Sequence, residues 1–156
     1  MSDEQPQPQS ASYQIQIAAQ YIKDLSFENP HAPQSLQPQQ EQPRIDVNVD
    51  VNASKLGEGP AYEVILKITA NAVSGDMPMF ACELSFAGVF TFGDMPEEHL
   101  HPVLLIECPR LLFPFARQIM ADATRDGGFP PLMIQPVDFA AMYRQTIERS
   151  QQQTQQ

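Results

Sequence analysis

Metal-binding residue types gather in one segment, which contains Glu97, Glu98, His99, His101 and Cys108. A structural zinc site needs four converging ligands, which the sequence usually supplies as two pairs. No second cysteine or histidine pair occurs elsewhere in the chain. We therefore predict no metal site and no cofactor.

The other reactive residues do not indicate an enzyme. Cys82 lies on the apolar side of an alternating segment and Cys108 precedes Pro109, which are positions typical of small buried side chains. The sequence Gly57-Glu58-Gly59 lacks the rest of a phosphate-binding loop, so we predict a hairpin turn there. No serine, histidine and acid combination has a recognisable catalytic setting.

An apolar segment, Phe129-Pro130-Pro131-Leu132-Met133-Ile134, stands where a polar loop would be expected. Large apolar residues beside two prolines indicate a binding surface, although they are also compatible with a loop that seals the core. Nine Phe and seven Met, with no Trp, supply soft and adaptable contact area. We assign to this polypeptide-binding surface the residues Phe80, Phe129, Leu132, Met133, Ile134, Phe139 and Tyr143.

The elements that must position this surface follow from periodicity. Residues 110–126 show apolar side chains at helical spacing, and Gly127 and Gly128 are expected to end that helix. Shorter helices are predicted at 97–107 and at 138–151, the last with Asp138 as N-cap. The apolar surface of the central helix is wider than one sheet needs, which indicates oligomerisation, ligand binding or both.

Four segments alternate between apolar and polar residues, as strands with one buried face do. They are residues 13–27, 45–53, 62–70 and 80–90. In the first we expect Ile15, Ile17, Ala19 and Tyr21 on the buried side. A crossing with four prolines joins the first two strands. Strands followed by helices predict an α+β domain in which helices pack on one face of a four-stranded antiparallel sheet.

Composition limits the function classes. The chain has 156 residues, enough for one domain, which we place at 12–149 between a disordered lead (1–11) and a disordered Gln-rich tail (150–156). A net charge of -10 disfavours binding to nucleic acid or to an anionic membrane and suits a basic partner. The polar start is unlike a signal peptide and no run is apolar enough to insert into a membrane, so we expect a cytoplasmic protein.

Five strings carry a family resemblance: YIKDLSFENPHAP, YEVILKITA, FACE, CPRLLFPFAR and GGFPPLMIQPVDF. Together they cover nearly everything from about Tyr13 to Tyr143. In this order they resemble the bacterial SecB family of export chaperones. The resemblance implies an ATP-independent chaperone that holds unfolded preproteins in apolar grooves and delivers them to the SecA motor. It also implies a homotetramer built as a dimer of dimers.

The resemblance implies roles for particular residues as well. The positions that would receive SecA are Asp24, Glu28, Ala81 and Glu83. Ala81 departs from the leucine that is usual in the family, which predicts a weaker apolar part of that contact. The tetramer interface would involve Leu112, Phe115, Ala116, Ile119, Met120 and Ala123.

Two other classes of function compete with this interpretation. One is a small-ligand enzyme or carrier with an apolar pocket under the Phe-Pro-Pro loop. Convergent polar groups in a compact pocket would favour it. The other is a scaffold whose spare apolar surface serves only assembly.

Overall fold

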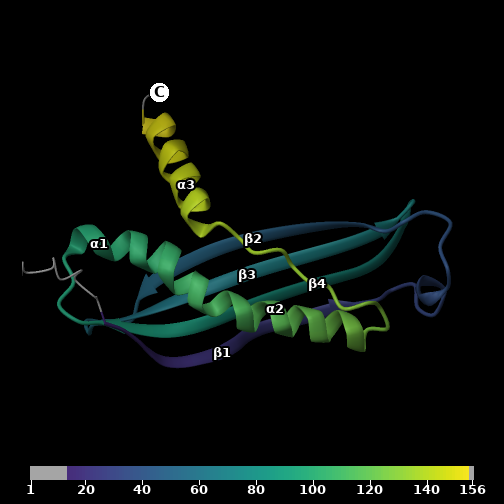
Figure 1. Ribbon diagram of the computed structural model, residues 1–156, viewed down its shortest axis with the longest axis horizontal. Coiled ribbons are helices and arrows are strands. Elements are labelled where there is room, and N and C mark those ends of the chain that lie inside the picture. The colour runs from purple at the N-terminus through teal and green to yellow at the C-terminus, as the bar shows by residue number, and fades with distance from the viewer. Residues whose placement is uncertain (1–13, 155–156) are drawn as a thin grey trace, which may run out of the picture.

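The computed structural model describes residues 14–154, which form an antiparallel sheet with a long helix along one face (Figure 1). The strands are β1 (Ile15–Glu28), β2 (Arg44–Lys55), β3 (Ala61–Ser74) and β4 (Met77–Phe92), in the spatial order β1-β4-β3-β2. A short 3-10 turn, η1 (Gln34–Leu36), interrupts the long crossing from β1 to β2. The predicted α+β class with a four-stranded antiparallel sheet is confirmed.

The two central strands carry most of the core. β3 and β4 form a hairpin whose tight turn contains Gly75 with φ of 57°. Every second residue of β3 from Val64 to Ala72 is buried, as the alternation predicts. β2 has the same alternation but lies at an edge, so Ile45 and Val47 on its inner face stay 41% and 37% exposed. β2 and β3 therefore share the same alternation of apolar and polar residues, but the apolar side chains of β2 are less buried than those of β3.

β1, the other edge strand, departs from its predicted pattern. Its register with β4 shifts between Ile17 and Ala19 and again between Ile22 and Asp24. An extra residue at a bulge moves the following side chains to the opposite face. Ile15 and Ile17 therefore face inward as expected, whereas Ala19 and Tyr21 lie opposite the outward-facing Val89 and Ala87. Our assignment of Ala19 and Tyr21 to the buried side was wrong.

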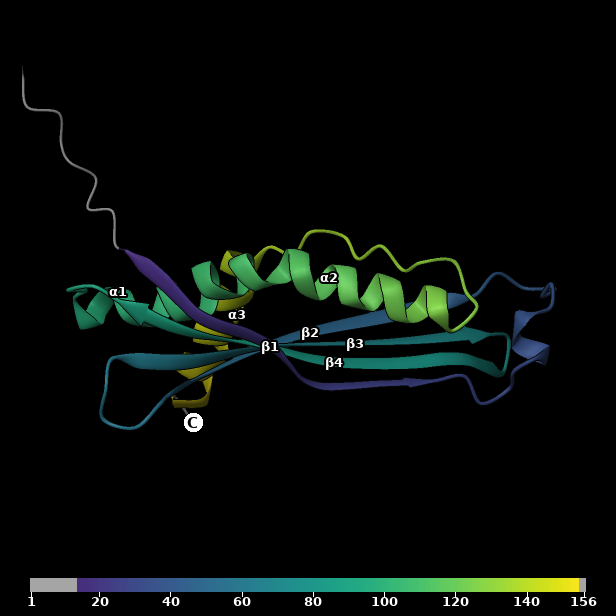
Figure 2. The same cartoon turned by 90° about the horizontal axis from the view of Figure 1, so that it is seen from below.

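One continuous helical stretch follows the sheet: α1 (Glu97–Pro102), the π-helical turn η2 (Val103–Glu107) and α2 (Cys108–Asp126). We predicted two separate helices, but the wider π turn joins them just before Pro109. α2 lies along one face of the sheet (Figure 2). It buries Leu112, Ala116 and Met120 against the strands, and Met120 Sδ lies 3.6 Å from Cys82 Sγ.

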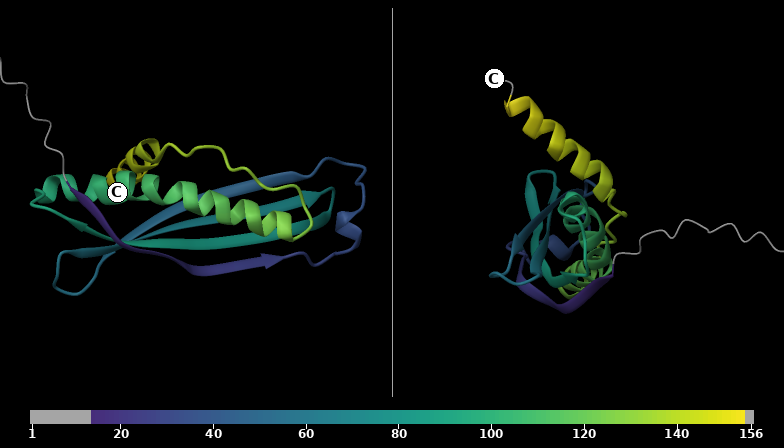
Figure 3. Two further views of the ribbon diagram at one scale, coloured as in Figure 1. Left: turned by 60° about the horizontal axis from the view of Figure 1, so that its bottom comes forward. Right: turned by 90° about the vertical axis from the view of Figure 1, so that its left-hand side faces the viewer.

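The last helix, α3 (Phe139–Thr154), projects away from the sheet and covers neither of its faces (Figure 3). The expected N-cap is present, since the Ala141 backbone N–H donates to Asp138 Oδ1 at 3.0 Å. The helix continues to Thr154, so the first five residues of the tail predicted to be disordered are helical. Residues 1–11, the predicted lead, lie outside the described residues.

Candidate functional site

A depression with an entirely apolar lining lies where the segment after α2 crosses the end of the sheet; we call it the apolar groove. It has a volume of about 250 Å³ and is lined by Pro43, Ile45, Ala72, Met79, Phe80, Phe129, Pro130, Pro131, Leu132 and Met133. A second hollow of about 320 Å³ continues it along the β1–β2 crossing and shares Pro43, Met79, Phe129 and Pro130 with it.

Aromatic rings form the wall of the groove beside β1. The Phe80 ring lies 5.0 Å from that of Phe129 and stacks on Phe27 at 5.8 Å. Phe27 reaches this position because Gly127 has no side chain, since a Cβ there would lie 2.2 Å from the Phe27 ring. Gly127 therefore serves close packing, while the left-handed φ of 97° occurs at Gly128.

Thr124 anchors the outer wall of the groove. It is fully buried in the last turn of α2, and its Oγ1 accepts a hydrogen bond from the Leu132 backbone N–H at 2.9 Å. The same hydroxyl donates to the carbonyl of Met120 or Ala121, both at 3.0 Å. The irregular segment after the helix is thereby fixed without any strand or helix of its own. Sequence reasoning missed Thr124, because a threonine in a helix carries no distinguishing signal.

The structure brings together four of the seven predicted polypeptide-binding residues: Phe80, Phe129, Leu132 and Met133. Met133 is the most accessible large apolar side chain among them, at 59% exposure. Ile134 and Phe139 are instead buried in the core, with the Phe139 ring 6.1 Å from that of Phe113.

Tyr143 lies elsewhere, on α3, with its hydroxyl 3.0 Å from His101 Nδ1. Periodicity does not reveal which apolar residues close the core and which line a surface. Sequence reasoning also missed six lining residues: Pro43, Ile45, Ala72, Met79, Pro130 and Pro131. Of these, Ile45 had a signal in the strand alternation, but its edge position was not visible.

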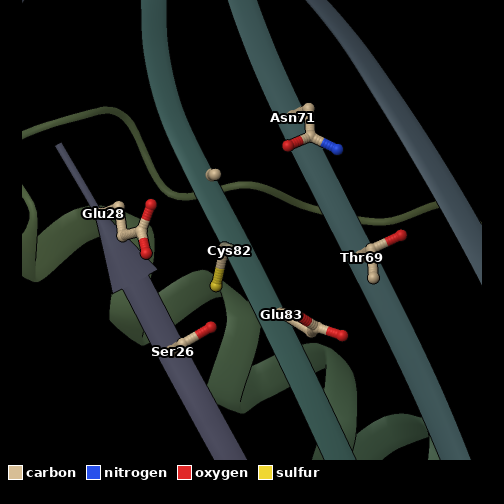
Figure 4. Close-up of a pocket in the computed structure, with 7 residues that line it drawn as sticks. Ser26, Glu28, Thr69, Asn71, Cys82 and Glu83 are labelled. Carbon is tan, nitrogen blue, oxygen red and sulfur yellow. The ribbon is translucent and has the colours of Figure 1, made fainter. Parts of the chain in front are cut away.

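The four residues assigned to SecA lie together on the outer face of the sheet, opposite α2. Glu28 pairs with Ala81, and Ser26 with Glu83, across β1 and β4, while Asp24 lies opposite Ser85. Figure 4 shows side chains from β1, β4 and β3 around this place, with the helix behind the sheet. We call it the acidic face. A pocket of about 150 Å³ opens there, between Ser26, Glu28, Thr69, Asn71, Ala81, Cys82 and Glu83.

Carboxylates dominate the electrostatics of the acidic face. Lys67 Nζ lies 2.8 Å from Glu83 Oε1. That hydrogen bond raises the pKa of Lys67, and the charges of Glu83, Asp50 and Asp24 raise it further. Three carboxylates, those of Glu83, Asp50 and Asp24, therefore act on Lys67.

A second polar cluster joins β1 to β3 on the same face. The Tyr21 hydroxyl donates to Glu63, whose other oxygen lies 2.8 Å from Lys23 Nζ. The hydrogen bond to Glu63, with a smaller contribution from burial, raises the pKa of Tyr21 to about 12. Hydrogen bonds from Lys23 and Tyr21 lower the pKa of Glu63.

The exposed side of α2 carries an apolar stripe, which we define as Leu111, Pro114, Phe115 and Ile119. Phe115 is 54% exposed and its ring lies 6.4 Å from that of Phe86, whose neighbour on β1 is the exposed Ile22. Of the predicted tetramer residues, Leu112, Ala116 and Met120 are fully buried within one chain, so their side chains are not accessible to a second copy in this conformation. They lie on the sheet-facing side of the helix, and helical spacing alone does not tell the two sides apart.

The structure places the potential metal ligands and the two thiols of residues 14–154. Within that range no three His, Cys, Asp or Glu side chains come close enough to hold a metal ion. Burial raises the pKa of both thiols, that of Cys108 to about 12 with a smaller contribution from Glu107, so both stay protonated at neutral pH. Among the helices in this range, none has the length and apolar character to cross a bilayer.

Known proteins resemble this chain in sequence. A family model described as preprotein translocase subunit SecB matches residues 7–150. The protein-export protein SecB of Rhodopseudomonas palustris strain TIE-1 is 57% identical over 148 residues, covering 95% of this chain and 94% of that protein. The protein-export protein SecB of Nitrobacter winogradskyi is 54% identical over 144 residues, covering 92% and 90%.

A solved structure shares the fold. The SecB-like chaperone of Mycobacterium tuberculosis, in complex with a peptide from the HigA1 antitoxin, superposes with a TM-score of 0.65 at 18% identity, covering 79% of this chain and 90% of that one. The family model spans nearly the whole chain, and the relatives exceed half identity over almost their full length. This chain therefore belongs to the SecB family of protein-export proteins.

Proposed function

We propose that this chain is a cytoplasmic holding chaperone that keeps unfolded preproteins competent for export and delivers them to the SecA motor without using ATP. The observation that carries the proposal is the open apolar groove in a chain of the SecB family. Met133, which lines this groove, is 59% exposed. Monomeric soluble proteins rarely leave such surface uncovered unless it binds something.

The lining explains how one groove accepts many sequences. It has proline, methionine, aliphatic and phenylalanine side chains and no polar side chain that would impose a hydrogen-bonding pattern. Each client side chain buried there contributes about 1.5–3 kcal/mol. Micromolar binding requires about 8 kcal/mol after the costs of association, so a client must occupy several sites at once.

Assembly supplies those several sites. We propose a homotetramer in which the apolar stripe of α2, with the remaining predicted residues Phe115, Ile119 and Ala123, meets a second copy. The exposed Ile22 and Leu25 of β1 extend the same apolar surface. Because an unfolded chain can bind to grooves on neighbouring protomers, each further contact becomes intramolecular and the overall affinity rises steeply.

The two partners would bind to opposite faces of one sheet. Ile45, Ala72 and Phe80 of the groove share the inner face with α2, whereas Asp24, Glu28 and Glu83 lie on the outer face. SecA can therefore bind the acidic face while a client occupies the groove. The alternative of a small-ligand enzyme or carrier is less well supported, because the groove lacks the convergent polar groups that fix a small substrate.

The experiment that tests the proposal measures binding of an unfolded precursor by calorimetry, with the same protein in its folded form as a comparison. We expect micromolar or tighter binding with a negative heat-capacity change for the unfolded form only. Met133→Ser should weaken this binding about tenfold, because one exposed apolar contact is lost.

A matched control is Leu56→Ser, which removes an apolar side chain of 40% exposure from the β2–β3 turn. Its affinity for the precursor should equal that of the wild type. Equal binding of folded and unfolded precursor, or equal losses in the two variants, would contradict the proposal.

A further inference from the structure

The second hollow differs from the apolar groove in the chemistry of its lining. Part of that lining is apolar and is shared with the groove. The β1–β2 crossing contributes the rest, which includes the polar residues Gln37, Gln39, Gln40, Glu41 and Gln42. Figure 1 shows the crossing at the end of the sheet where α2 stops. Polar amide side chains therefore border an otherwise apolar depression.

The crossing is anchored near both ends, so its side chains keep their place beside the hollow. Asn29 Nδ2 donates to the Gly127 carbonyl at 3.2 Å, next to the end of α2. The hydroxyl of the buried Ser35 donates to Asn29 Oδ1 at 2.6 Å. Near the other end, the Ser74 hydroxyl donates to the Glu41 carbonyl at 2.8 Å. The crossing thus presents a preformed polar surface.

Three side-chain amides on this surface are uncommitted; we call Gln37, Gln40 and Gln42 the glutamine lip. All three residues are exposed, and none of their side-chain amides has a hydrogen-bond partner within residues 14–154. Gln39 differs, because its Nε2 donates to the carbonyls of Gln34 and Gln37 at 3.1 and 2.8 Å. Gln39 therefore holds the shape of the crossing, while the amides of the lip face solvent.

A primary amide suits a polypeptide backbone. It carries two N–H donors and a carbonyl acceptor in one plane, so it can bond to both the C=O and the N–H groups of a peptide chain. It is uncharged and does not select for charged client side chains. In folded proteins these backbone groups are almost all paired already, whereas an extended segment of an unfolded chain offers them freely.

The geometry of an extended chain brings these groups to the lip. Side chains of such a segment alternate above and below it, and its N–H and C=O groups point sideways. A segment that places apolar side chains in the groove therefore directs backbone groups towards the border of the depression, where the lip lies.

We propose that the glutamine lip binds the backbone of an extended client segment while the apolar lining takes its side chains. The inference rests on the proposed function and specifies its substrate class, which is polypeptide with unpaired backbone N–H and C=O groups. Apolar contact alone would not distinguish such a segment from any other apolar molecule. Hydrogen bonds from the lip supply that distinction without reading the client's sequence.

The test is a competition assay in which two synthetic peptides displace a fluorescent unfolded precursor from the full chain. Both peptides have the same phenylalanine- and leucine-rich side chains. One has an ordinary backbone, and the other carries methyl groups on alternate backbone nitrogens, which removes those N–H donors. The wild type should bind the N-methylated peptide about tenfold more weakly, as expected for the loss of one or two hydrogen bonds.

The decisive variant combines Gln37→Met, Gln40→Met and Gln42→Met, which keep unbranched side chains of similar length and remove the amides. We expect it to bind the ordinary peptide about tenfold more weakly than the wild type does. It should bind the two peptides within about twofold of each other. A purely apolar depression predicts the opposite sign, because three methionines add apolar surface and tighten binding.

The matched control combines Gln145→Met, Gln151→Met and Gln152→Met. It makes the same change at three exposed glutamines of α3, which do not line the hollow. This variant should keep both wild-type affinities within about twofold. The discrimination is a ratio of two affinities measured on one protein, so it does not depend on the fraction of each variant that is folded.

The outcomes separate the inference from the function on which it rests. If the wild type binds unfolded precursor but binds the two peptides equally, the lip proposal is overturned while the proposed function stands. The same holds if the lip variant keeps the tenfold discrimination or binds the ordinary peptide more tightly. If the wild type binds neither precursor nor peptide, the proposed function fails and the lip proposal fails with it.

Discussion

Replacing Thr124 by valine removes a single hydroxyl from a fully buried position while keeping the shape of the side chain. The Leu132 backbone N–H, which now donates to Thr124 Oγ1 at 2.9 Å, loses its partner. Leaving a buried donor unsatisfied costs about 1–3 kcal/mol. The carbonyls of Met120 and Ala121 also lose the hydroxyl as a donor. We therefore expect the segment at 129–133 to detach from the end of α2.

Hydrogen exchange at the Leu132 amide measures this detachment directly. A cost of that size should speed exchange by about tenfold to hundredfold, since 1.4 kcal/mol corresponds to a factor of ten. Client affinity should fall as well, because this segment forms the outer wall of the apolar groove. Urea denaturation at a fixed protomer concentration then gives the total loss of stability.

Thr124→Ser is the control that isolates the hydroxyl. It keeps the acceptor for Leu132 and removes one methyl group, which costs about 0.8 kcal/mol of burial. We expect this variant to lose some stability but to retain slow exchange at Leu132 and normal client affinity. Slow exchange in the valine variant, or fast exchange in both variants, would refute the role given to the hydroxyl.

Three further predictions concern other parts of the structure. If the proposed tetramer forms through the apolar stripe of α2, Phe115→Asp should dissociate it in sedimentation measurements without unfolding the protomer, because Phe115 is 54% exposed in one chain. Leu112→Asp should instead unfold the protomer, because Leu112 is fully buried. A tetramer that persists in Phe115→Asp would exclude the stripe as an interface. Gly127→Ala should destabilise the protein by about 1–3 kcal/mol in urea denaturation, because its Cβ would meet the Phe27 ring at 2.2 Å. Gly59→Ala should not destabilise the protein, because a Cβ there would have nothing within 4 Å. Equal urea midpoints for the two variants would contradict this prediction. The pKa of Tyr21 is raised from 10.0 to about 12, so the stability that its protonated hydroxyl contributes is complete below pH 10 and is lost as the pH rises towards 12. Tyr21→Phe should abolish that part of the loss of stability at alkaline pH. An unchanged curve of stability against pH would speak against the hydrogen bond to Glu63.

The sequence alone determined the fold class and the family. Strict alternation predicted the strands, and all of their centres lie where the pattern places them. Asp138 caps α3 as expected, and the glycines after Asp126 end α2. The acidic residues assigned to the SecA contact, Asp24, Glu28 and Glu83, also share one face. These features follow from local pattern or from strings that resemble a known family.

The tertiary structure decided which apolar residues remain exposed. Leu111 and Leu112 are neighbours of the same type, yet Leu111 is 42% exposed and Leu112 is fully buried, because only one side of α2 meets the sheet. The register shift between Ile17 and Ala19 placed Tyr21 on the outer face, where its hydroxyl donates to Glu63.

The groove likewise depends on contacts between distant residues. Ile45 lies near the start of the edge strand β2 and Met79 lies in β4, shortly after the β3–β4 turn. Thr124 holds the segment that contributes the other wall of the groove. Periodicity shows which residues of a helix or strand lie on its apolar side and which lie on its polar side. It does not report which neighbour covers each side, and that choice, made by residues far apart in the chain, created both the groove and the pocket at Ala81.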